Sequence, residues 1–372
     1  MKRVLFLNLT AFSQTGGIER FNKCFLKALS DLDREHITDS HSFSLYDNAV
    51  SELYYTATRY KGFRKNKAAF ILQSIFSARK FDVIILGHIN LAIVGIAIKK
   101  LYPSKSVLLV THGIDVWGVL SGAKKSILRV ADRILSVSNF TKSKIEEMHG
   151  VDGAKITVFP NTIDPYFPMP ESTERVDTLR ARYNISPDDF VVYTLTRLAN
   201  TELYKGYDKV IAALGSIVPD YPHVKYVIAG KYDLQEQQRI NALIDEHGLN
   251  GHVILTGFLD EKELVAHYQM ADVYIMPSKK EGFGIVFIEA LVCGVPVIAG
   301  NADGSVDALL NGESGTLVNP DSADEIKYAI IKHLKKNHRA DNAERTAIRN
   351  KTLDNFSFDR YKKRLEDLIA SC

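Results

Sequence analysis

The chain alternates short apolar runs with longer amphipathic segments, and this alternation constrains its fold more than any other feature. Val4–Asn8 is such an apolar run. A polar loop, TAFSQTGG, follows it, and apolar residues then recur at helical spacing from Ile18 to Leu32. A short, continuously apolar run is typical of a strand buried on both faces of a parallel sheet. The pattern therefore predicts an α/β fold with helices on both faces of a parallel sheet.

The same pattern occurs twice, on either side of a proline-rich stretch. Four of the eleven prolines lie between Pro160 and Pro170, which predicts an interdomain linker because proline fixes φ and lacks an amide hydrogen. Before the linker, further strands are expected at Val83–Leu86, Val107–Val110, Ile134–Val137 and Ile156–Phe159. After it, strands are expected at Val191–Thr194, Tyr226–Ala229, Val253–Thr256, Val273–Met276, Val295–Ala299 and Gly315–Val318. Helices are expected at Tyr207–Ile217, Gln235–Glu246, Lys262–Gln269 and Ile285–Val292, with a final helix from about Asp359 to Ile369.

Two doubly wound, Rossmann-like domains facing each other across a central cleft are therefore predicted. The first covers residues 1–165 and the second residues 172–355. A length of 372 residues suits two domains, because a single core of that size is unusual.

The composition argues against several classes of protein. A net charge of +3 without a dense basic face does not indicate a nucleic-acid binder. The three cysteines, Cys24, Cys293 and Cys372, are scattered, lack zinc-ligand spacing and suit a reducing cytoplasm. No apolar stretch approaches the ~20 residues that cross a bilayer, and the short run after Lys2 and Arg3 lacks the cleavage site of a signal peptide. We expect a cytoplasmic protein whose contact with a membrane would be peripheral.

Ligand-binding residues are expected where strands end, because parallel sheets bind ligands beyond the carboxyl ends of their strands. Gly16 and Gly17 lie between the first strand and the first helix. Glycines there let a ligand approach the backbone, and the amides of a helix start attract phosphate. A tight turn without a ligand is the alternative. The pattern is not G-x-G-x-x-G, so a dehydrogenase is not supported.

Charged and polar side chains follow two other predicted strands. Arg197 and Lys205 would clamp a diphosphate through charge-assisted hydrogen bonds, or would form a solvated surface pair. His112 ends the strand VLLVTHG and is expected to face the cleft. There it would bond a substrate hydroxyl or stabilise charge at the reacting carbon; a purely structural histidine is the alternative.

The stretch SKKEGFGIVFIEALVCG, residues 278–294, supplies the clearest candidates. Glu281 follows a predicted strand, and the Gly282–Phe283–Gly284 bend leads into a helix that begins at Ile285, so the amides there would face phosphate or sugar. Glu289 lies about five residues inside that helix, roughly 7–8 Å along its axis. The carboxylates would therefore meet two ends of one ligand, with sugar hydroxyls at the first and ribose hydroxyls at the second. An ordinary amphipathic helix would leave Glu289 unexplained, because an acid among apolar neighbours needs a partner.

Two other clusters are weaker candidates. Asp31 and Asp33 form an Asp-x-Asp pattern, but it ends a predicted helix and does not follow a strand, so no metal site is expected there. The basic run RYKGFRKNK, Arg59 to Lys67, is typical of a solvated face. Contact with anionic lipid or with a pyrophosphate-linked acceptor is the alternative. No metal and no cofactor are expected.

Taken together, these motifs resemble the retaining glycosyltransferases of family 4, which have the GT-B fold. The most specific match is EGFGIVFIEALVCGVPVIA, which contains the E-x7-E motif of that family. TGGIER, THGIDVW, PNTID, TRL…YKG and FSFDRYKKRL occur in order and at family spacing, over nearly the whole chain. The resemblance implies an acceptor domain at 1–165, a donor domain at 172–355 and a last segment, 356–372, whose helix crosses back to the first domain.

The resemblance also implies roles for the candidates of the second domain. Glu281 would contact the donor sugar and Glu289 the ribose of the nucleotide. Arg197 and Lys205 would hold the diphosphate and neutralise the leaving group. Retention would follow from front-face attack without a metal or a protein nucleophile, so catalysis would rest on orientation and electrostatics.

In the first domain, the amide of Gly17 would reach the phosphate and His112 would sit beside the transferred sugar. The chain departs from the family in the loop GNADGSVDALLNG, where Ser305 and Asp307 stand in place of residues that many relatives have as glycine and glutamate. This loop lies near the base or the phosphates in the family, so the departure concerns the identity of the donor. The YKGYD form of the lysine motif resembles members that use GDP-mannose to build exopolysaccharides.

The expected function is transfer of a hexose, mannose from GDP-mannose by preference, to a glycan or polyprenyl-diphosphate-linked acceptor in cell-surface polysaccharide synthesis. The partners would be the donor, the acceptor and, peripherally, the inner membrane. A UDP-sugar donor, a nucleotide-sugar 2-epimerase and a non-catalytic sugar-binding protein are the alternatives. Acceptor contacts are expected in loops around Tyr46–Asn66, whose sequence shows no recognisable pattern.

Overall fold

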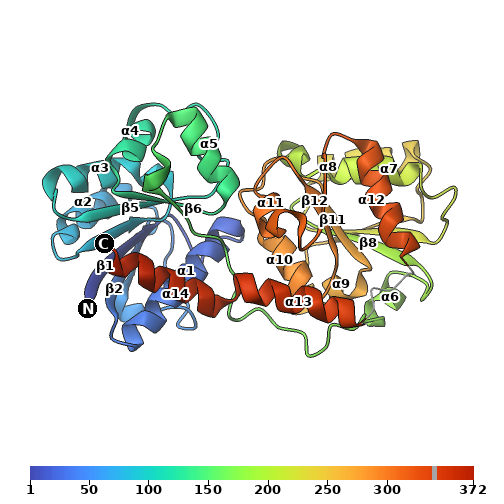
Figure 1. Ribbon diagram of the computed structural model, residues 1–372, viewed down its shortest axis with the longest axis horizontal. Helices are drawn as coiled ribbons and strands as arrows, with labels where there is room; N and C mark the ends of the chain where they lie inside the picture. Colours follow the sequence, from blue (N-terminus) through green and yellow to red (C-terminus); the bar gives the residue numbers. More distant parts are fainter. Residues whose placement is uncertain (337–341) are drawn as a thin grey trace. The chain divides into compact units, whose positions relative to one another are not determined.

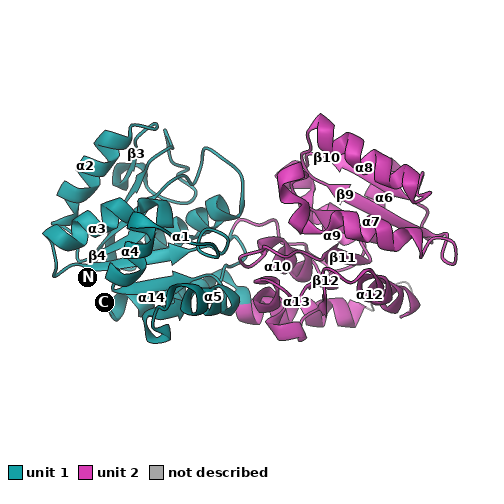
Figure 2. Ribbon diagram, turned by 90° about the horizontal axis from the view of Figure 1, so that it is seen from above, with its two compact units in different colours: residues 1–165, 356–372 teal, residues 166–355 magenta. Residues whose placement is uncertain are grey.

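The computed structural model describes residues 1–336 and 342–372, and the chain divides into two compact units (Figure 2). Unit 1 comprises Met1–Pro165 together with Phe356–Cys372, and unit 2 comprises Tyr166–Asn355. Each unit is built on one parallel sheet flanked by helices (Figure 1). This architecture confirms the α/β class predicted from the alternation of apolar runs and helical segments.

The sheet of unit 1 has seven parallel strands in the order β3-β2-β1-β4-β5-β6-β7. The strands are β1 Lys2–Asn8, β2 Thr38–Ser44, β3 Tyr60–Gly62, β4 Val83–Leu86, β5 Ser106–Thr111, β6 Arg133–Ser136 and β7 Ile156–Val158. The α-helices are α1 Gly17–Arg34, α2 Lys67–Ala78, α3 Ala92–Leu101, α4 Gly122–Val130, α5 Asn139–His149 and α14 Phe358–Ala370. Short 3-10 helices are η1 Ala57–Arg59, η2 Ile89–Leu91 and η3 Gly153–Lys155. Because the strands are parallel, their carboxyl ends meet along one edge of the sheet.

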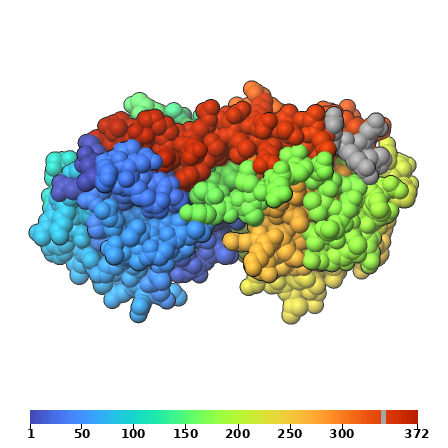
Figure 3. Space-filling model, turned by 90° about the horizontal axis from the view of Figure 1, so that it is seen from below, coloured from blue at the N-terminus to red at the C-terminus, as the bar shows by residue number. Residues whose placement is uncertain are grey.

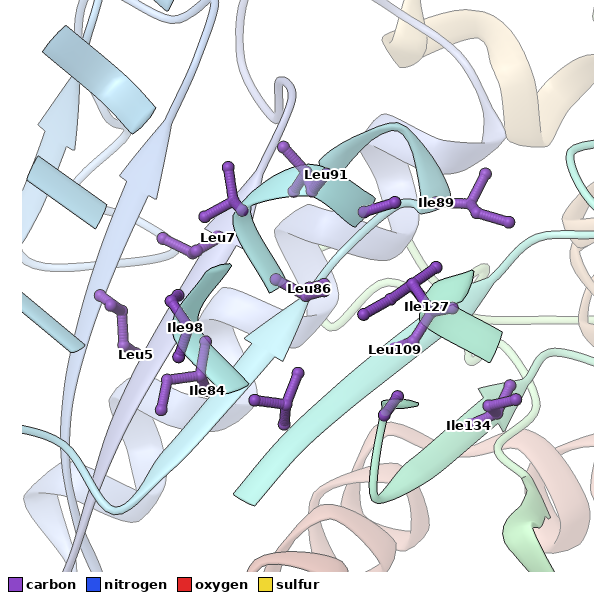
Figure 4. Close-up of a cluster of buried hydrophobic side chains, with 14 of the residues drawn as sticks. Leu5, Leu7, Ile84, Leu86, Ile89, Leu91, Ile98, Leu109, Ile127 and Ile134 are labelled. Carbon is purple, nitrogen blue, oxygen red and sulfur yellow. The ribbon is translucent and has the colours of Figure 1, made fainter. Parts of the chain in front are cut away.

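The central strands of unit 1 are apolar on both faces because helices cover both. Leu5 of β1 and Ile84 and Leu86 of β4 point to the face covered by α3 and α4, where they join a cluster of buried apolar side chains (Figure 4). Phe6 points to the opposite face, where its ring lies 4.6 Å from that of Phe25 in α1. Both sets are fully buried, which explains the continuously apolar strand sequences.

Strand β2 has no hydropathic pattern in the sequence, because its residues, TDSHSFS, are mostly polar. Ser42 and Ser44 are nevertheless fully buried. The Ser42 hydroxyl accepts a hydrogen bond from Asn8 at 3.1 Å, and that of Ser44 donates to Asp47 at 2.8 Å. Such bonds offset the cost of burying hydroxyl groups, so a polar segment forms an interior strand.

The sheet of unit 2 has six parallel strands in the order β10-β9-β8-β11-β12-β13. The strands are β8 Phe190–Leu195, β9 Val224–Ala229, β10 Val253–Gly257, β11 Val273–Met276, β12 Val297–Gly300 and β13 Thr316–Val318. The α-helices are α6 Thr178–Arg182, α7 Tyr207–Gly215, α8 Leu234–Glu246, α9 Leu264–Met270, α10 Ile285–Val292, α11 Ser305–Ala308, α12 Ala323–Lys335 and α13 Asn342–Phe356. Short 3-10 helices are η4 Asn200–Lys205, η5 Glu261–Glu263 and η6 Leu310–Gly312.

The boundaries predicted for the strands and helices of this half differ from the observed ones by no more than two residues, and α10 is predicted to the residue. The strand predicted from Val295 begins later, at Val297. Pro296 explains the delay, because it has no amide hydrogen for the ladder.

The chain between β7 and α6, residues 159–177, forms no helix or strand, as its prolines predict. At the other end of the sequence, α14 packs against α1 within unit 1, and Figure 3 shows its red residues beside blue amino-terminal ones. The ring of Tyr361 in α14 lies 4.6 Å from that of Phe159 and 6.3 Å from that of Phe21. Among the residues described, no helix is both long enough and apolar enough to cross a bilayer.

Candidate functional site

Neighbouring strands of unit 2 bring Lys205 and Glu281 together. Because β8 and β11 pair in parallel, the segments after their carboxyl ends lie side by side: η4 after β8, and residues 277–284 after β11. Lys205 Nζ and Glu281 Oε1 form an ion pair, and the two side chains are only 16% and 15% exposed. Burial is the largest single effect and lowers the pKa of Lys205, but the charge of Glu281, its hydrogen bond and the smaller effects of Tyr204 and Glu202 together raise the net pKa. Lys205 is therefore charged at neutral pH.

Backbone contacts hold these two loops against each other. Lys279 N donates to Tyr204 O at 3.0 Å. Gly206 has a φ of +78°, and a Cβ atom there would lie 2.4 Å from Pro277 O, so glycine alone fits at this position. The loops thus approach closely enough for residues 76 apart in sequence to form an ion pair.

Arg197 lies beside a different carboxylate. Its guanidinium pairs with Glu202 of η4 at 2.6 Å, with 69% of the arginine side chain and 13% of the glutamate side chain exposed. The sequence predicts a single clamp of Arg197 and Lys205, whereas in the structure each cation has its own acidic partner. The arginine of this pair is exposed to solvent, which screens its charge and weakens the ion pair.

The bend before α10 presents the start of that helix. Gly284 has a φ of +88°, and a Cβ atom there would lie 2.3 Å from the ring of Phe287. Glycine is therefore required where the chain turns into the helix. The amides of the first helical turn have no acceptor within the helix and carry its positive dipole end. Ile285 begins this turn, three residues after Gly282 and beside the carboxylate-bearing loop.

Glu289 is fully buried inside α10. Its Oε2 accepts a hydrogen bond from the Tyr268 hydroxyl of α9 at 3.0 Å. The sequence predicts that this acid needs a partner, and the structure supplies one from the protein itself. Contact between Glu289 and a ribose, which stays a prediction, would require the groups that cover the carboxylate to move.

A buried carboxylate that the sequence analysis did not select, Asp303, lies in the loop between β12 and α11. Its Oδ2 accepts from Ser278 Oγ at 2.7 Å and from Glu281 N at 2.8 Å, and its Oδ1 accepts from Ser305 N at 2.9 Å. Burial raises the pKa of Asp303 to about 6. The sequence signal for Asp303 is its place after a strand end, two residues before Ser305 and four before Asp307.

In unit 1, Gly17 begins α1 and Gly16 precedes it in an extended conformation. Both are exposed. A Cβ atom at Gly16 would lie 2.6 Å from Glu19 Oε2, whereas one at Gly17 would meet nothing within 4 Å. The start of α1 is thus open at Gly17 and occupied by a carboxylate beside Gly16.

The loop that leads to these glycines is organised by Asp47, another buried carboxylate outside the sequence prediction. It accepts hydrogen bonds from Ala11 N at 2.7 Å, Ser13 N at 2.9 Å and Tyr60 Oη at 2.6 Å. Burial raises the pKa of Asp47, but these hydrogen bonds, that of Tyr60 first, bring the net pKa below its usual value. The carboxylate is therefore ionised over the physiological range.

His112 follows β5 and bonds to its neighbouring loop. Its Nε2 lies 2.8 Å from Gly87 O, and because a carbonyl only accepts, Nε2 carries the proton and Nδ1 is an acceptor. Burial lowers the pKa of His112 to about 4. The ring of His88 stacks 5.9 Å away, and burial lowers the pKa of His88 to about 3. Two neutral imidazoles therefore lie here. The expected roles of His112, a bond to a substrate hydroxyl or stabilisation of charge at the reacting carbon, stay predictions.

The weaker candidates have structural partners. Lys27 pairs with Asp31 at 2.5 Å, and Asp33 accepts from Thr38 Oγ1 at 2.6 Å and pairs with Arg59 at 3.1 Å. These partners account for both aspartates without a metal. Within the described ranges, no group of three or more histidine, cysteine, aspartate or glutamate side chains is arranged to hold a metal ion.

Comparison with known proteins decides the family. Residues 15–167 match the model of Glycosyltransferase Family 4, and residues 176–350 match that of Glycosyl transferases group 1. A GDP-mannose-dependent alpha-(1-6)-phosphatidylinositol monomannoside mannosyltransferase of Mycolicibacterium smegmatis is 32% identical over 279 residues, which are 72% of this chain and 70% of that protein. The chain belongs to the family 4 glycosyltransferases.

Other relatives of this glycosyltransferase agree. The mannosyltransferase of the same description from Mycobacterium tuberculosis is 33% identical over 252 residues, or 65% of this chain, and the match spans 63% of that protein, less than two thirds of its length. The structure of Anabaena Alr3699/HepE in complex with UDP superposes with a TM-score of 0.80 at 20% identity and covers all of both chains. The structural likeness confirms the predicted GT-B fold.

Proposed function

We propose that this glycosyltransferase moves a hexose, mannose from GDP-mannose by preference, to a glycan or polyprenyl-diphosphate-linked acceptor in cell-surface polysaccharide synthesis. The observation that carries the proposal is the Lys205–Glu281 pair at the start of α10. One ligand could contact both groups: its phosphate would meet the Lys205 cation, and its sugar hydroxyls would donate hydrogen bonds to the Glu281 carboxylate. The GDP-mannose-dependent relatives support the choice of donor.

Unit 2, residues 172–355 in the sequence prediction, would bind the donor. Lys205 would exchange Glu281 for the diphosphate, and Arg197 would exchange Glu202 for it. Each exchange leaves a carboxylate with free acceptor atoms, and Glu281 would use them for hydroxyls of the sugar. The remaining donor contacts would come from the amides of Gly282, Phe283, Gly284 and Ile285 and from Glu289 to the ribose.

The chemistry proposed for the site is electrostatic. As the nucleoside diphosphate leaves, negative charge grows on its phosphate, and two fixed cations with the amides at the start of α10 would stabilise that charge. We propose transfer with retention, by front-face attack on an oxocarbenium-like sugar, with no metal or cofactor and with Lys205 and Arg197 in the place a metal ion would take.

Unit 1, residues 1–165 in the sequence prediction, would bind the acceptor. The amide of Gly17 is exposed at the start of α1 and would meet a phosphate of the donor. His112, neutral and with Nδ1 as an acceptor, would receive a hydrogen bond from a sugar hydroxyl. Gly16 would let the ligand approach the backbone once Glu19 moves aside.

A membrane surface on α2 would suit a lipid-linked acceptor. Leu72 and Phe76, one turn apart on this helix, are 58% and 64% exposed. Residues 53–81 contain seven arginines and lysines and no acid, and Lys67 begins the helix. An apolar stripe between cations fits the surface of an anionic bilayer, so we propose peripheral contact at the cytoplasmic face of the inner membrane.

Two alternative readings concern the donor and the reaction. The first alternative is the same transfer reaction with a UDP-sugar as donor. The Anabaena structures in complex with UDP and with UDP-glucose support this alternative. A nucleotide-sugar 2-epimerase of the same architecture would act on the donor alone.

A thermal-shift panel with GDP, UDP, ADP and their sugars tests the proposal. The correct nucleotide should raise Tm most, because a ligand stabilises by RT ln(1 + [L]/Kd), and GDP and GDP-mannose are expected to do so. Acceptor-dependent release of GDP must follow. A new sugar nucleotide formed without acceptor would establish the epimerase, and the absence of any shift would remove the donor site altogether.

A further inference from the structure

We propose that Asp303 is a positioning residue of the donor site: its buried carboxylate fixes the peptide of Glu281 and so aims the Glu281 side chain. This inference rests on the proposed function for its effect on donor binding, although the structural effect can be measured without any donor.

The peptide of Glu281 is held on both sides by one loop. Its N–H donates to Asp303 Oδ2 at 2.8 Å, and its carbonyl accepts from Gly304 N at 2.8 Å. Two consecutive residues of the β12–α11 loop therefore bind both backbone polar groups of the same residue. With these two bonds, the backbone of Glu281 has little freedom to turn its side chain away from Lys205.

The loops also touch too closely for other side chains. A Cβ atom at Gly304 would lie 2.1 Å from Gly282 O, and one at Gly300 would lie 2.1 Å from Ser278 O. Glycine at both positions brings the end of β12 against the loop after β11. The backbone that Asp303 binds thus encloses it, and its carboxylate is shielded from solvent.

Three hydrogen-bond donors share the two oxygens of the Asp303 carboxylate. Ser278 Oγ and Glu281 N bind Oδ2, and Ser305 N binds Oδ1. An asparagine fills the same volume, but its NH2 group would face at least one of these donors. Asp303→Asn therefore removes hydrogen bonds without creating a cavity.

The ionisation of Asp303 offers a second signature. Burial raises its pKa to about 6, and the charge of Glu281 contributes in the same direction. The charged neighbours that face it are Glu281 and, through that residue, Lys205. The folded-state pKa lies above the unfolded-state value, so ionisation of Asp303 lowers the stability of the fold as pH rises through about 6. The same ionisation gives the Glu281 amide a charged acceptor, which fixes the loop. Donor affinity should therefore rise with pH over the range in which this group destabilises the fold.

The test compares the wild type with Asp303→Asn and with a matched control, Asp189→Asn. Asp189 is also a buried carboxylate of unit 2 that accepts from a backbone amide, Ser186 N at 2.8 Å, but it precedes β8 at the opposite edge of the sheet. Hydrogen exchange of the peptide spanning 279–284 should be about tenfold faster in Asp303→Asn and unchanged in Asp189→Asn, because only Asp303→Asn replaces the charged acceptor of the Glu281 amide by a neutral one.

Donor affinity is then measured with GDP-mannose and UDP-glucose at pH 7.5 and 5.5, since phosphodiesters of nucleotide sugars do not titrate there. In the wild type, Kd should rise severalfold between pH 7.5 and pH 5.5. In Asp303→Asn, Kd at pH 7.5 should be about tenfold higher than in the wild type and should not change between the two pH values. Wild-type exchange and wild-type Kd in Asp303→Asn would overturn the inference.

The outcomes separate this inference from the proposed function. Faster exchange in Asp303→Asn with no binding of any nucleotide sugar by the wild type would leave the positioning role intact and refute the donor site. If Asp303→Asn does not fold, Ser278→Ala is used instead, because it removes one of the three hydrogen-bond donors to Asp303. Faster hydrogen exchange at 279–284 would then support the positioning role of Asp303, and wild-type exchange would refute it.

Discussion

At the scale of single residues, the candidate site consists of charges that already have partners. Lys205 is paired with Glu281, and Arg197 with Glu202. Largely buried charges such as those of Lys205, Glu281 and Glu202 need such partners in the absence of ligand. Binding of a diphosphate, as proposed, would then be an exchange of partners, and its free energy would be a difference between two sets of ion pairs.

Lys205→Ala should reduce kcat/KM for transfer at least 100-fold. It removes the charge that would stabilise the leaving group, and it leaves Glu281 partly buried without a cation, a combination that costs several kcal/mol. Steady-state transfer kinetics measure the loss. Lys209→Ala, four residues away and exposed on α7, is the control and should transfer at the wild-type rate; equal rates for both variants would show that Lys205 has no part in the reaction.

Acid should destabilise the fold through its neutral histidines. The folded-state pKa of His112 is about 4, below the unfolded value of about 6.5. Its stabilising contribution is present above pH 6.5 and declines as pH falls toward 4, by about 2 kcal/mol at pH 5. Urea unfolding at pH 7 and pH 5 should show this decline in the wild type.

In His112→Gln the decline between pH 7 and pH 5 should be smaller by that amount. Asp115, whose pKa burial raises to about 7, titrates in the opposite direction and is present in both proteins, so the comparison isolates the histidine. An unchanged decline would show that His112 titrates normally in the folded state.

At the scale of elements, the site is built from segments that begin where parallel strands end. α10 is apolar along most of its length and has Gly284 at its start. The helix supplies hydrophobic packing through its body and polar amides at its first turn. The same eight residues thus belong to the core and would also supply the proposed ligand contacts.

Gly284→Ala should destabilise unit 2 by about 3 kcal/mol. The substitution combines a positive φ with a Cβ atom 2.3 Å from the ring of Phe287, and strain of each kind costs roughly 1–3 kcal/mol. Gly248→Ala is the matched control, because its φ is +64° but a Cβ atom would meet nothing within 4 Å. Denaturant unfolding should show a loss of about 1 kcal/mol for the control. Equal losses would mean that Phe287 moves aside freely.

At the scale of the whole molecule, charge is unevenly distributed along the chain. The net charge is +3, yet residues 53–81 alone contribute +7, because they hold seven cations and no acid. Arg59 of this segment is compensated by Asp33 and Asp39. In sequence, the remaining cations stand on both sides of the exposed apolar residues of α2.

The double variant Leu72→Ser/Phe76→Ser should lose most of its binding to vesicles containing anionic lipid. Burying two large side chains contributes roughly 3–5 kcal/mol, so cosedimentation should fall more than tenfold. Leu234→Ser, which changes a side chain 77% exposed on α8 of unit 2, is the control and should bind as the wild type does. Wild-type binding by the double variant would remove α2 as the membrane surface.

Much of the fold could be predicted from the sequence because both sheets are parallel and largely apolar. A strand buried on both faces is a continuous apolar run, and the helix after it has its own period, so Val83–Leu86 and α10 were predicted to the residue. Strand β2 could not be predicted, since the hydrogen bonds that make burial of its serines possible leave no hydropathic pattern. Their partners are Asn8, 34 residues from Ser42, and the nearer Asp33 and Asp47.

The sequence by itself determined the two α/β repeats, the family and the set of residues at the strand ends, because these depend on local periodicity and on motifs. The roles of those residues, and the cleft between the two domains, stay predictions. Only the tertiary structure decided the partners: that Lys205 meets Glu281, that Glu289 meets Tyr268, and that Asp303 holds the Glu281 peptide. The physical reason is that strand order in a parallel sheet, and not separation in sequence, sets which strand ends are neighbours.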